Sequence, residues 1–357
     1  MKKIIVAAVI VCVVLGYILL NTPERRIKAE LTALLNSTEK IEEWEIKDIT
    51  FKNNTLELVL PNILYNGQRI KAASVVMTNL DIKVQSIDSI VVKDVFYSGD
   101  GMRCQIKQIT SNDVVVENLK PGYAVSRGIA EISDLACRIE DDLQLTIGQV
   151  FSPARRQISD VIPEKTTESM QNIQITMMGT TINIPEVVFT GTYQKETLEY
   201  TYTLAPMILE GLAVVEGGMT ITDVDYQVWK DMNNPLVLSS EVEVRMSHAW
   251  FSVQDKGLAK RIYSLLGAGA GISGPQVRQL FLDELKGSGG SFESAYKNGR
   301  ALHRALIEIL TNPRSIDIVF EPAVPVIITD DFDPSLDELG MSISVNGKAP
   351  VKVEPLF

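Results

Sequence analysis

The pattern of hydrophobic and polar residues changes its period along the chain, and each period predicts a different element. An uninterrupted apolar run comes first, then a short stretch at helical spacing, then a long region in which apolar and polar residues alternate. Helical spacing returns once, late in the chain, before a final alternating stretch. Because alternation puts every second side chain on one face of a strand, we predict an α+β, mainly β fold. Its long antiparallel sheet is expected to carry a late helical insertion.

The apolar run extends from Ile4 to Leu20 and follows Lys2 and Lys3. At a rise of ~1.5 Å per residue it forms a helix of roughly 25 Å, which is enough to cross the hydrocarbon core of a bilayer. No cleavage site of the Ala-x-Ala type follows the run, so a cleaved secretory signal is disfavoured. We therefore expect residues 1–22 to be an uncleaved transmembrane anchor.

Residues 23–43 are predicted to form a juxtamembrane helix. Pro23 suits a first helical turn, and the apolar residues that follow recur on one helical face. Lys2 and Lys3 favour an inside N-terminus, whereas the basic residues of this segment count against that orientation. The members of the apolar face are Ile27, Leu31, Leu34 and Leu35.

Residues 44–255 alternate as half-buried strands do, and turn signals such as Asn53-Asn54 and Asn66-Gly67 separate the alternating segments. We predict a β-rich domain built on one long, curved antiparallel sheet. One polar interruption, between Ser152 and Gln171, is expected to be helical. The clearest strand segments are Leu56–Leu60, Ile82–Val84, Cys104–Ile106, Val114–Val116, Leu143–Ile147, Ile173–Ile175, Leu198–Tyr202 and Val242–Met246.

A short pattern of an apolar residue, a polar residue, aspartate and a second apolar residue recurs within this region. Its spacing matches a repeating hairpin. The aspartates could be ligands repeated along a surface, but the favoured interpretation places each on the solvated side of its strand or at a bulge. The repeated segments are Ile46–Ile49, Val92–Val95, Ile132–Leu135 and Ile221–Val224.

Residues 256–312 are predicted to be a helical insertion. Apolar residues fall on one helical face in 257–266, 275–285 and 291–310, and Gly-rich connections join these segments. Alternation then returns in residues 313–357, which we expect to complete the β domain.

The composition limits the partners that the chain can have. With 45% hydrophobic and 22% charged residues it is expected to be globular. The net charge of −11 and the lack of clustered Lys and Arg exclude nucleic acid as an expected partner.

Cys12 lies in the apolar run, which leaves Cys104 and Cys137 in the β-rich domain. In an oxidising compartment they could form a disulfide, whose closed loop of about 33 residues would contribute roughly 3–4 kcal/mol to stability. The alternative is a pair of buried thiols, and the sequence leaves both open.

Two motifs that can carry chemistry occur late in the chain. Gly269–Gly274 matches the dinucleotide-binding pattern Gly-x-Gly-x-x-Gly, but a helical pattern and no strand precedes it, so an interhelical loop is favoured. Ser294 and Lys297 match the Ser-x-x-Lys pair of penicillin-binding proteins, but no Lys-Thr-Gly follows. A solvated helix face is the favoured interpretation.

The remaining polar candidates do not form a site. His248 and His303 are the only histidines, and neither has further ligands at zinc spacing. The acidic loop Asp330–Asp333, with Asp337 and Glu338, lacks the glycine of a calcium-binding EF-hand loop. We therefore predict no catalytic residue, no metal and no cofactor, and we do not expect an enzyme.

The apolar N-terminal run, the repeated strands with their Ile-x-Asp-Val-like segments, and the late strand Ser342–Gly347 together resemble the AsmA-like and YdgA-like bacterial envelope proteins. This resemblance implies a single-pass protein of the bacterial inner membrane with the bulk of its chain in the periplasm. It also implies a curved sheet that offers an apolar concavity to lipid, or that supports the assembly of outer-membrane components. The resemblance carries over no catalytic residues.

Two functions from different classes therefore remain open. In the first, the apolar sheet face binds or moves phospholipid, because a long sheet with few helices leaves part of that face uncovered. In the second, the core is filled and the chain is an anchored scaffold or assembly factor that binds envelope-assembly proteins and no ligand. The sequence does not say which residues would face the lipid.

Overall fold

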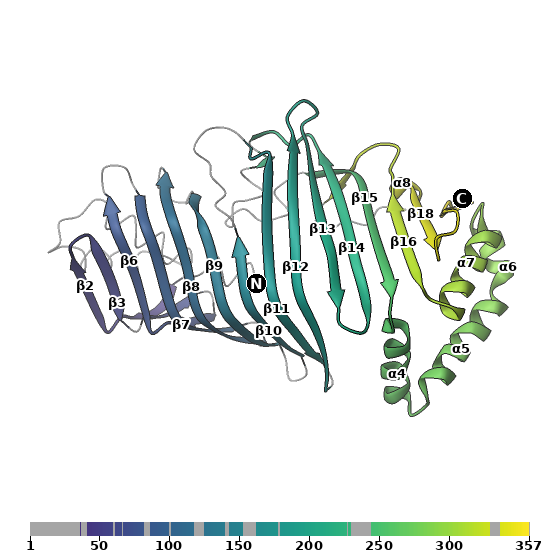
Figure 1. Cartoon of the computed structure of the whole chain (residues 1–357), viewed down its shortest axis with the longest axis horizontal. Helices are drawn as coiled ribbons and strands as arrows, with labels where there is room; N and C mark the ends of the chain where they lie inside the picture. Colours follow the sequence, from purple (N-terminus) through teal and green to yellow (C-terminus); the bar gives the residue numbers. More distant parts are fainter. Residues whose placement is uncertain are drawn as a thin grey trace. The chain divides into compact units, whose positions relative to one another are not determined.

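In a computed structural model of the 357-residue chain, most of the described residues form antiparallel β-strands (Figure 1). Nineteen strands occur in the described residues, and most of the helices come late in the chain. The chain divides into an N-terminal unit, Met1–Glu186 with Met232–Leu238, and a C-terminal unit, Val187–Asp231 with Ser239–Phe357. The described residues are 36, 41–59, 61–65, 67–81, 86–99, 101–117, 125–139, 143–152, 162–177, 179–226, 228–229, 244–328 and 336–356.

In the N-terminal unit each long strand pairs antiparallel with the next. The ladder runs through β2 (Asp48–Lys52), β3 (Thr55–Val59), β6 (Ser74–Asp81), β7 (Ser86–Gly99), β8 (Met102–Glu117), β9 (Val125–Ile139), β10 (Leu143–Ser152) and β11 (Lys165–Met177). A shorter ladder of β1 (Ile41–Glu45), β4 (Asn62–Tyr65) and β5 (Gln68–Lys71) joins the sheet where β5 pairs with β7.

The boundary between the units falls within β12 (Thr180–Gln194). The ladder of the C-terminal unit continues through β13 (Glu199–Leu209), β14 (Ala213–Thr222), β15 (Val244–Asp255), β16 (Ser315–Phe320), β18 (Met341–Val345) and β19 (Val351–Lys352), with β17 (Val326–Ile328) also paired to β15. The helices of this unit are α4 (Leu258–Ala270), α5 (Gly274–Gly287), α6 (Gly289–Ala295), α7 (Gly299–Thr311) and α8 (Leu336–Leu339).

Two of the repeated aspartates interrupt the pairing of neighbouring strands without shifting its register. Asp94 and Asp134 have φ of 50° and 51°, and Asn172 has 55°, a left-handed conformation that Asp and Asn tolerate better than most residues. Each of them is unpaired opposite Lys107 or Gly148, and the register is the same on both sides of the gap. Asp94 and Asp134 are exposed, so the predicted solvated position is confirmed for both, whereas no extra residue is inserted and the predicted alternative of a bulge is wrong for both. The other two aspartates of the repeat are also exposed: Asp48 begins β2 and Asp223 follows β14.

Two predicted helices conflict with the structure where it describes them. Of the juxtamembrane helix predicted for 23–43, Asn36 is helical and 41–43 belong to β1, which begins at Ile41 and pairs with Tyr65 of β4; the other residues of this prediction lie outside the described ones. The interruption predicted between Ser152 and Gln171 overlaps β11, which begins at Lys165, and its residues 153–161 lie outside the described ones. Register pairing with β10 holds this polar segment extended, as in Val150 opposite Met170, and therefore overrides its polar composition.

The helix predicted for 291–310 is two helices, α6 and α7. Tyr296 between them is extended and forms an isolated bridge with Pro355, and the Lys297 amide donates to the Glu354 carbonyl over 2.8 Å. This long-range pairing stops the helix, so local periodicity could not reveal the break. The boundaries of the insertion agree with the prediction of 256–312, because α4 begins at Leu258 and α7 ends at Thr311.

The predicted anchor lies outside the described residues, together with Lys2, Lys3, Ile4 and Leu20. Within the described part of the chain, no helix has the length and apolar character needed to span a membrane.

Each unit has its own core. In the N-terminal unit the sheet buries Leu56, Leu58, Met77, Val95 and Tyr97 almost completely. In the C-terminal unit Tyr200, Ile221 and Trp229 are buried together, while α7 buries Leu302 against Ile343, Val345 and Val353.

Candidate functional site

A row of apolar residues crosses the sheet of the C-terminal unit on a single face. In register, Phe189 of β12 lies opposite Leu204, Leu204 opposite Gly217, Gly217 opposite Phe251, and Phe251 opposite Ile318. We call these five residues the apolar row. They point to the face that carries buried Tyr200, Ile221 and Met246, as pairing and strand alternation require.

The apolar row is only partly covered, although it lies on the face of the core. Phe251 is 42% exposed and Phe189 is 37% exposed, whereas Tyr200 and Ile221 on the same face are fully buried. Large aromatic side chains that remain exposed on the core face of a sheet are the kind of surface that binds another apolar molecule.

Two adjacent glycines in β14 lie opposite two aromatic residues of β15. A Cβ at Gly218 would lie 2.6 Å from Nε1 of Trp250, so the absence of a side chain there makes room for the indole. A Cβ at Gly217 would lie 3.0 Å from the Trp250 carbonyl oxygen and in ordinary contact, at 3.5 Å, with Cδ2 of Phe251. Phe251 and Trp250 point to opposite faces, so Gly217 adds no side chain of its own to the face that carries Phe251.

Both ends of this face are closed by packed side chains. At one end the Trp229 ring lies 4.7 Å from the Tyr200 ring, and Trp229 is only 2% exposed. At the other end α7 covers Ile318 and Ile343 with Leu302, Leu306 and Ile309. Phe189 and Phe251 belong to neither of these packed groups and remain exposed.

A pocket of about 200 Å³ continues the apolar row beneath α4. Its floor is Val253 and Ile316, which pair with each other and lie two residues along from Phe251 and Ile318 on the same face. Its other apolar lining comes from Leu258, Ala259 and Ile262 of α4, Ile309 of α7, and Pro313. A cavity of this size is below the ~300–1,000 Å³ of a typical small-molecule site, so it accommodates the end of a chain and not a whole ligand.

The polar groups at this pocket have structural roles. Asp255 Oδ1 accepts hydrogen bonds from the amides of Gly257 and Leu258 at 2.6 and 2.7 Å, which caps the start of α4. Burial raises the pKa of the Tyr263 phenol, Asp255 raises it further, and Arg278 opposes the shift. The phenol therefore stays neutral at physiological pH.

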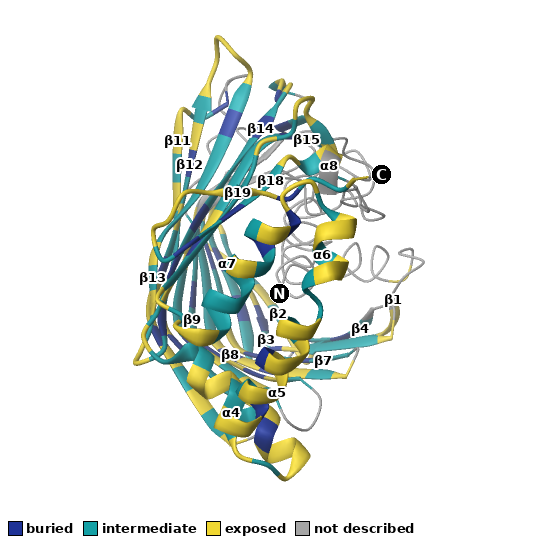
Figure 2. Ribbon diagram, turned by 90° about the vertical axis from the view of Figure 1, so that its right-hand side faces the viewer, coloured by how far each residue is buried: buried dark blue, intermediate teal, exposed yellow. Residues whose placement is uncertain are grey.

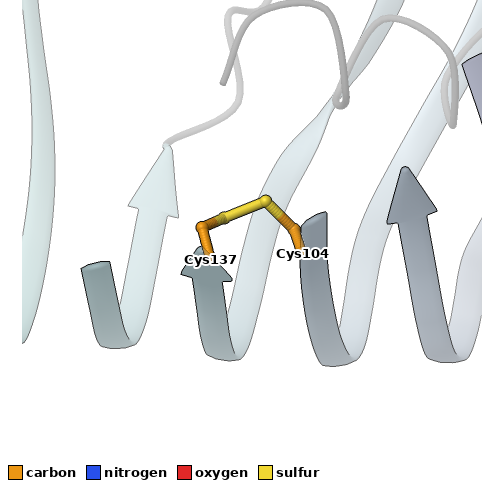
Figure 3. The surroundings of a disulfide bond; sticks show 2 residues. All are labelled: Cys104 and Cys137. Atoms are coloured by element: carbon orange, nitrogen blue, oxygen red, sulfur yellow. A yellow bond between two sulfur atoms is a disulfide. The ribbon is translucent and has the colours of Figure 1, made fainter. Parts of the chain in front are cut away.

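The structure joins Cys104 to Cys137 by a disulfide between neighbouring strands β8 and β9 (Figure 3). Their Cα atoms are 4.1 Å apart, and both residues are buried. Of the two alternatives that the sequence leaves open, the structure has the bonded one. The disulfide lies in the N-terminal unit.

The motifs with enzymatic precedents have other partners. Gly269–Gly274 covers the end of α4 and the start of α5, so a helix precedes it as predicted. Ser294 donates to the Ser291 carbonyl at 3.0 Å, and Lys297 pairs with Glu354 at 3.8 Å. Neither side chain of the Ser-x-x-Lys pair is directed to a shared reaction centre.

The histidines also stand apart from each other. His248 lies on β15 with Glu321 3.9 Å from its Nδ1, and His303 lies on α7 with its Nε2 2.5 Å from the Leu285 carbonyl oxygen. The part of the chain that the structure describes contains no group of His, Cys, Asp or Glu that could hold a metal ion. The acidic loop Asp330–Asp333 lies outside the described residues.

Sequence reasoning did not identify the apolar row. Gly217 and Gly218, a dipeptide typical of turns, lie within β14, opposite Phe251 and Trp250. A pair of glycines opposite a pair of aromatic residues was the available signal. Exposure of Phe251 depends on which elements cover the sheet, and a strand pattern does not contain that information.

No family model matches the chain, and no curated protein matches it significantly. The resemblance to AsmA-like and YdgA-like envelope proteins therefore stays a prediction.

Proposed function

We propose that this chain is an envelope protein, anchored in the bacterial inner membrane, whose C-terminal unit binds the acyl chain of a lipid along the apolar row. The observation that carries the proposal is the exposure of Phe189 and Phe251 on the face that elsewhere forms the core. An acyl chain laid across this row would remove apolar surface from water and gain about 0.8 kcal/mol per buried methylene before the costs of binding.

The pocket under α4 supports a linear ligand over a bulky one. Val253 lies two residues after Phe251 on the same face of β15, and it forms part of the pocket floor. The end of an acyl chain that follows the row can enter this space, whereas the pocket volume of about 200 Å³ is below that of a typical small-molecule site.

The disulfide supports the periplasmic location that the proposal requires. Disulfides form in oxidising compartments such as the periplasm and are rare in the cytosol. Lys2, Lys3 and the apolar run from Ile4 to Leu20 supply the proposed anchor.

The alternative scaffold function is favoured by the N-terminal unit. Leu56, Leu58, Met77 and Tyr97 are at most 1% exposed, so the core around them is filled. The two functions can therefore be assigned to different units: support for the N-terminal one and lipid binding for the C-terminal one.

A charged substitution in the apolar row tests this assignment. In the full chain, Phe251→Asp should reduce the amount of co-purifying phospholipid several-fold, because a carboxylate on the row cannot be buried beneath an acyl chain without a large desolvation cost. Phe251 is already 42% exposed, so the fold should survive. Bound lipid is measured by mass spectrometry of solvent extracts.

Ile208→Asp is the matched control. Ile208 is 53% exposed and lies on the opposite face of β13, since its neighbour Leu209 pairs with buried Ala213. This variant should keep its lipid, and it corrects for lipid held elsewhere on the chain. Equal lipid in both variants would remove the apolar row as the binding site and leave the scaffold function.

A further inference from the structure

The hairpin of α4 and α5 carries a second set of exposed apolar side chains. Leu280 is 62% exposed and Phe281 43% exposed on α5, and Ile262 and Leu266 are exposed one turn apart on α4. The rings of Tyr263 and Phe281 lie 6.4 Å apart, which brings the two helices together at this surface. We call Ile262, Leu266, Leu280 and Phe281 the hairpin patch. Much of α4 and α5 is exposed, as the yellow stretches of both helices show (Figure 2).

The charge of this region is opposite to that of the whole chain. Residues 256–314 contain nine Lys and Arg and four Asp and Glu, a net charge of +5, whereas the chain has a net charge of −11 and the remainder therefore −16. An anionic surface repels the rest of the chain and attracts this segment.

Two of the four acidic side chains in the segment are in ion pairs. Glu293 accepts hydrogen bonds from Arg300 at 2.9 and 3.2 Å, and these bonds hold the pKa of the carboxyl below its usual range. Glu308 pairs with Lys348, which lowers the pKa of Glu308 in the same way. Both therefore remain ionised and paired. The other two acidic residues, Asp283 and Glu284, are exposed on α5, so residues 256–287, which contain α4 and α5, have five Lys and Arg against two Asp and Glu, a net charge of +3.

The basic residues of α4 flank its apolar ones. Lys260 and Arg261 are exposed and immediately precede Ile262, so the helix has an apolar face and a basic polar face. This is the pattern of helices that lie in the plane of a membrane, with apolar side chains at the boundary between headgroups and acyl chains and basic side chains at the phosphates.

We propose that the α4–α5 hairpin docks on an anionic lipid bilayer through the hairpin patch, with Lys260 and Arg261 at the lipid phosphates. Charge complementarity selects an anionic membrane over a neutral one, and the paired exposed aliphatic and aromatic side chains select a membrane over a purely ionic partner. The docking does not require the apolar row to hold a lipid.

A fluorophore placed on the hairpin patch tests the proposal in the full chain. An environment-sensitive dye is attached at Leu280→Cys in a Cys12→Ser background without reductant, so that the bonded Cys104 and Cys137 do not react. The protein is reconstituted in vesicles whose phosphatidylcholine carries brominated acyl chains, with or without phosphatidylglycerol. Dye quenching should be several-fold greater in the vesicles that contain phosphatidylglycerol, and added salt should weaken it.

Two controls make the result specific. Dye at Ile208→Cys, another exposed apolar position, should stay unquenched in every vesicle. The pair Lys260→Glu and Arg261→Glu should reduce quenching at position 280 without changing lipid bound at the apolar row. Equal quenching at 208 and 280, or quenching at 280 that is the same without phosphatidylglycerol, would overturn the proposal. So would an unquenched dye at 280 whose emission changes with protein concentration, because that result identifies a second copy of the chain as the occupant.

Discussion

Replacing Trp229 with alanine should lower the free energy of unfolding of the C-terminal unit by about 3–5 kcal/mol, the usual cost of deleting a buried large aromatic side chain. Trp229 is 2% exposed, and its ring packs 4.7 Å from that of Tyr200, which is fully buried. The indole therefore closes one end of the face that carries the apolar row. Its loss leaves a cavity against Tyr200 that the surrounding strands cannot fill without distortion.

Denaturant unfolding measures this change, and Phe189→Ala is the matched control. Phe189 is also aromatic and lies on the same face, but it is 37% exposed, so its truncation should cost less than about 1.5 kcal/mol because little buried area is lost. If Trp229→Ala and Phe189→Ala cost the same, the indole does not form the cover that the structure shows. Trp229→Phe should recover part of the loss.

Removing the disulfide should destabilise the N-terminal unit by about 3–4 kcal/mol on the chain-entropy estimate for a loop of this length. The bond spans 33 residues and joins β8 near its start to β9 near its end, where Cys104 and Cys137 lie directly opposite each other. Cys104→Ala with Cys137→Ala is preferred to serine, because both positions are buried and a buried hydroxyl without a partner would add its own cost.

Reduction of the unsubstituted protein should lower the melting temperature to a similar extent, while Cys12→Ala alone should leave it unchanged. Thiol labelling of the unreduced, denatured protein provides the decisive check. We expect no labelling of Cys104 or Cys137, because their thiols are bonded to each other. Full labelling of both would mean that they are buried thiols in solution.

The alternating regions of the sequence are predictable because a strand's side chains report directly on its two faces. Leu143–Ile147 was predicted as a strand and lies in β10. Leu198–Tyr202 was also predicted as a strand; Leu198 lies in the turn before β13, and the other four residues begin β13. The helical insertion was also located correctly, because helical spacing of apolar residues is a local signal. The spacing did not predict burial, since Ile262, Leu266, Leu280 and Phe281 belong to the apolar faces of α4 and α5 and are exposed.

The features that sequence reasoning missed depend on residues distant in the chain. Tyr296 breaks a helix because it pairs with Pro355, and Lys165–Gln171 is a strand because β10 lies beside it. The exposure of Phe251 also depends on residues that are distant in the chain. Its strand and its face follow from alternation, but the extent of its cover is set by α7 and Trp229, which approach from opposite ends of the face.

The repeated aspartates show how a polar motif can be structural. Asp94 and Asp134 recur at hairpin spacing, which a binding repeat would also produce, yet each is an exposed left-handed residue at a gap in the pairing of its strand. Lys107 pairs with Asp134 at 3.4 Å on the exposed side. The recurrence therefore reflects where the pairing of consecutive strands is interrupted, and no ligand is needed to explain it.

Photo-crosslinking from the apolar row tests the central claim most directly. Benzoylphenylalanine replaces Phe251 in the full chain with little change in shape, and irradiation in bacterial cells should attach a phospholipid to the peptide that contains residue 251, as detected by mass spectrometry. The same replacement at Ile208, on the opposite face, should yield no lipid adduct. Absence of an adduct at 251 in folded protein, or equal adducts at 251 and 208, would contradict lipid binding on this face.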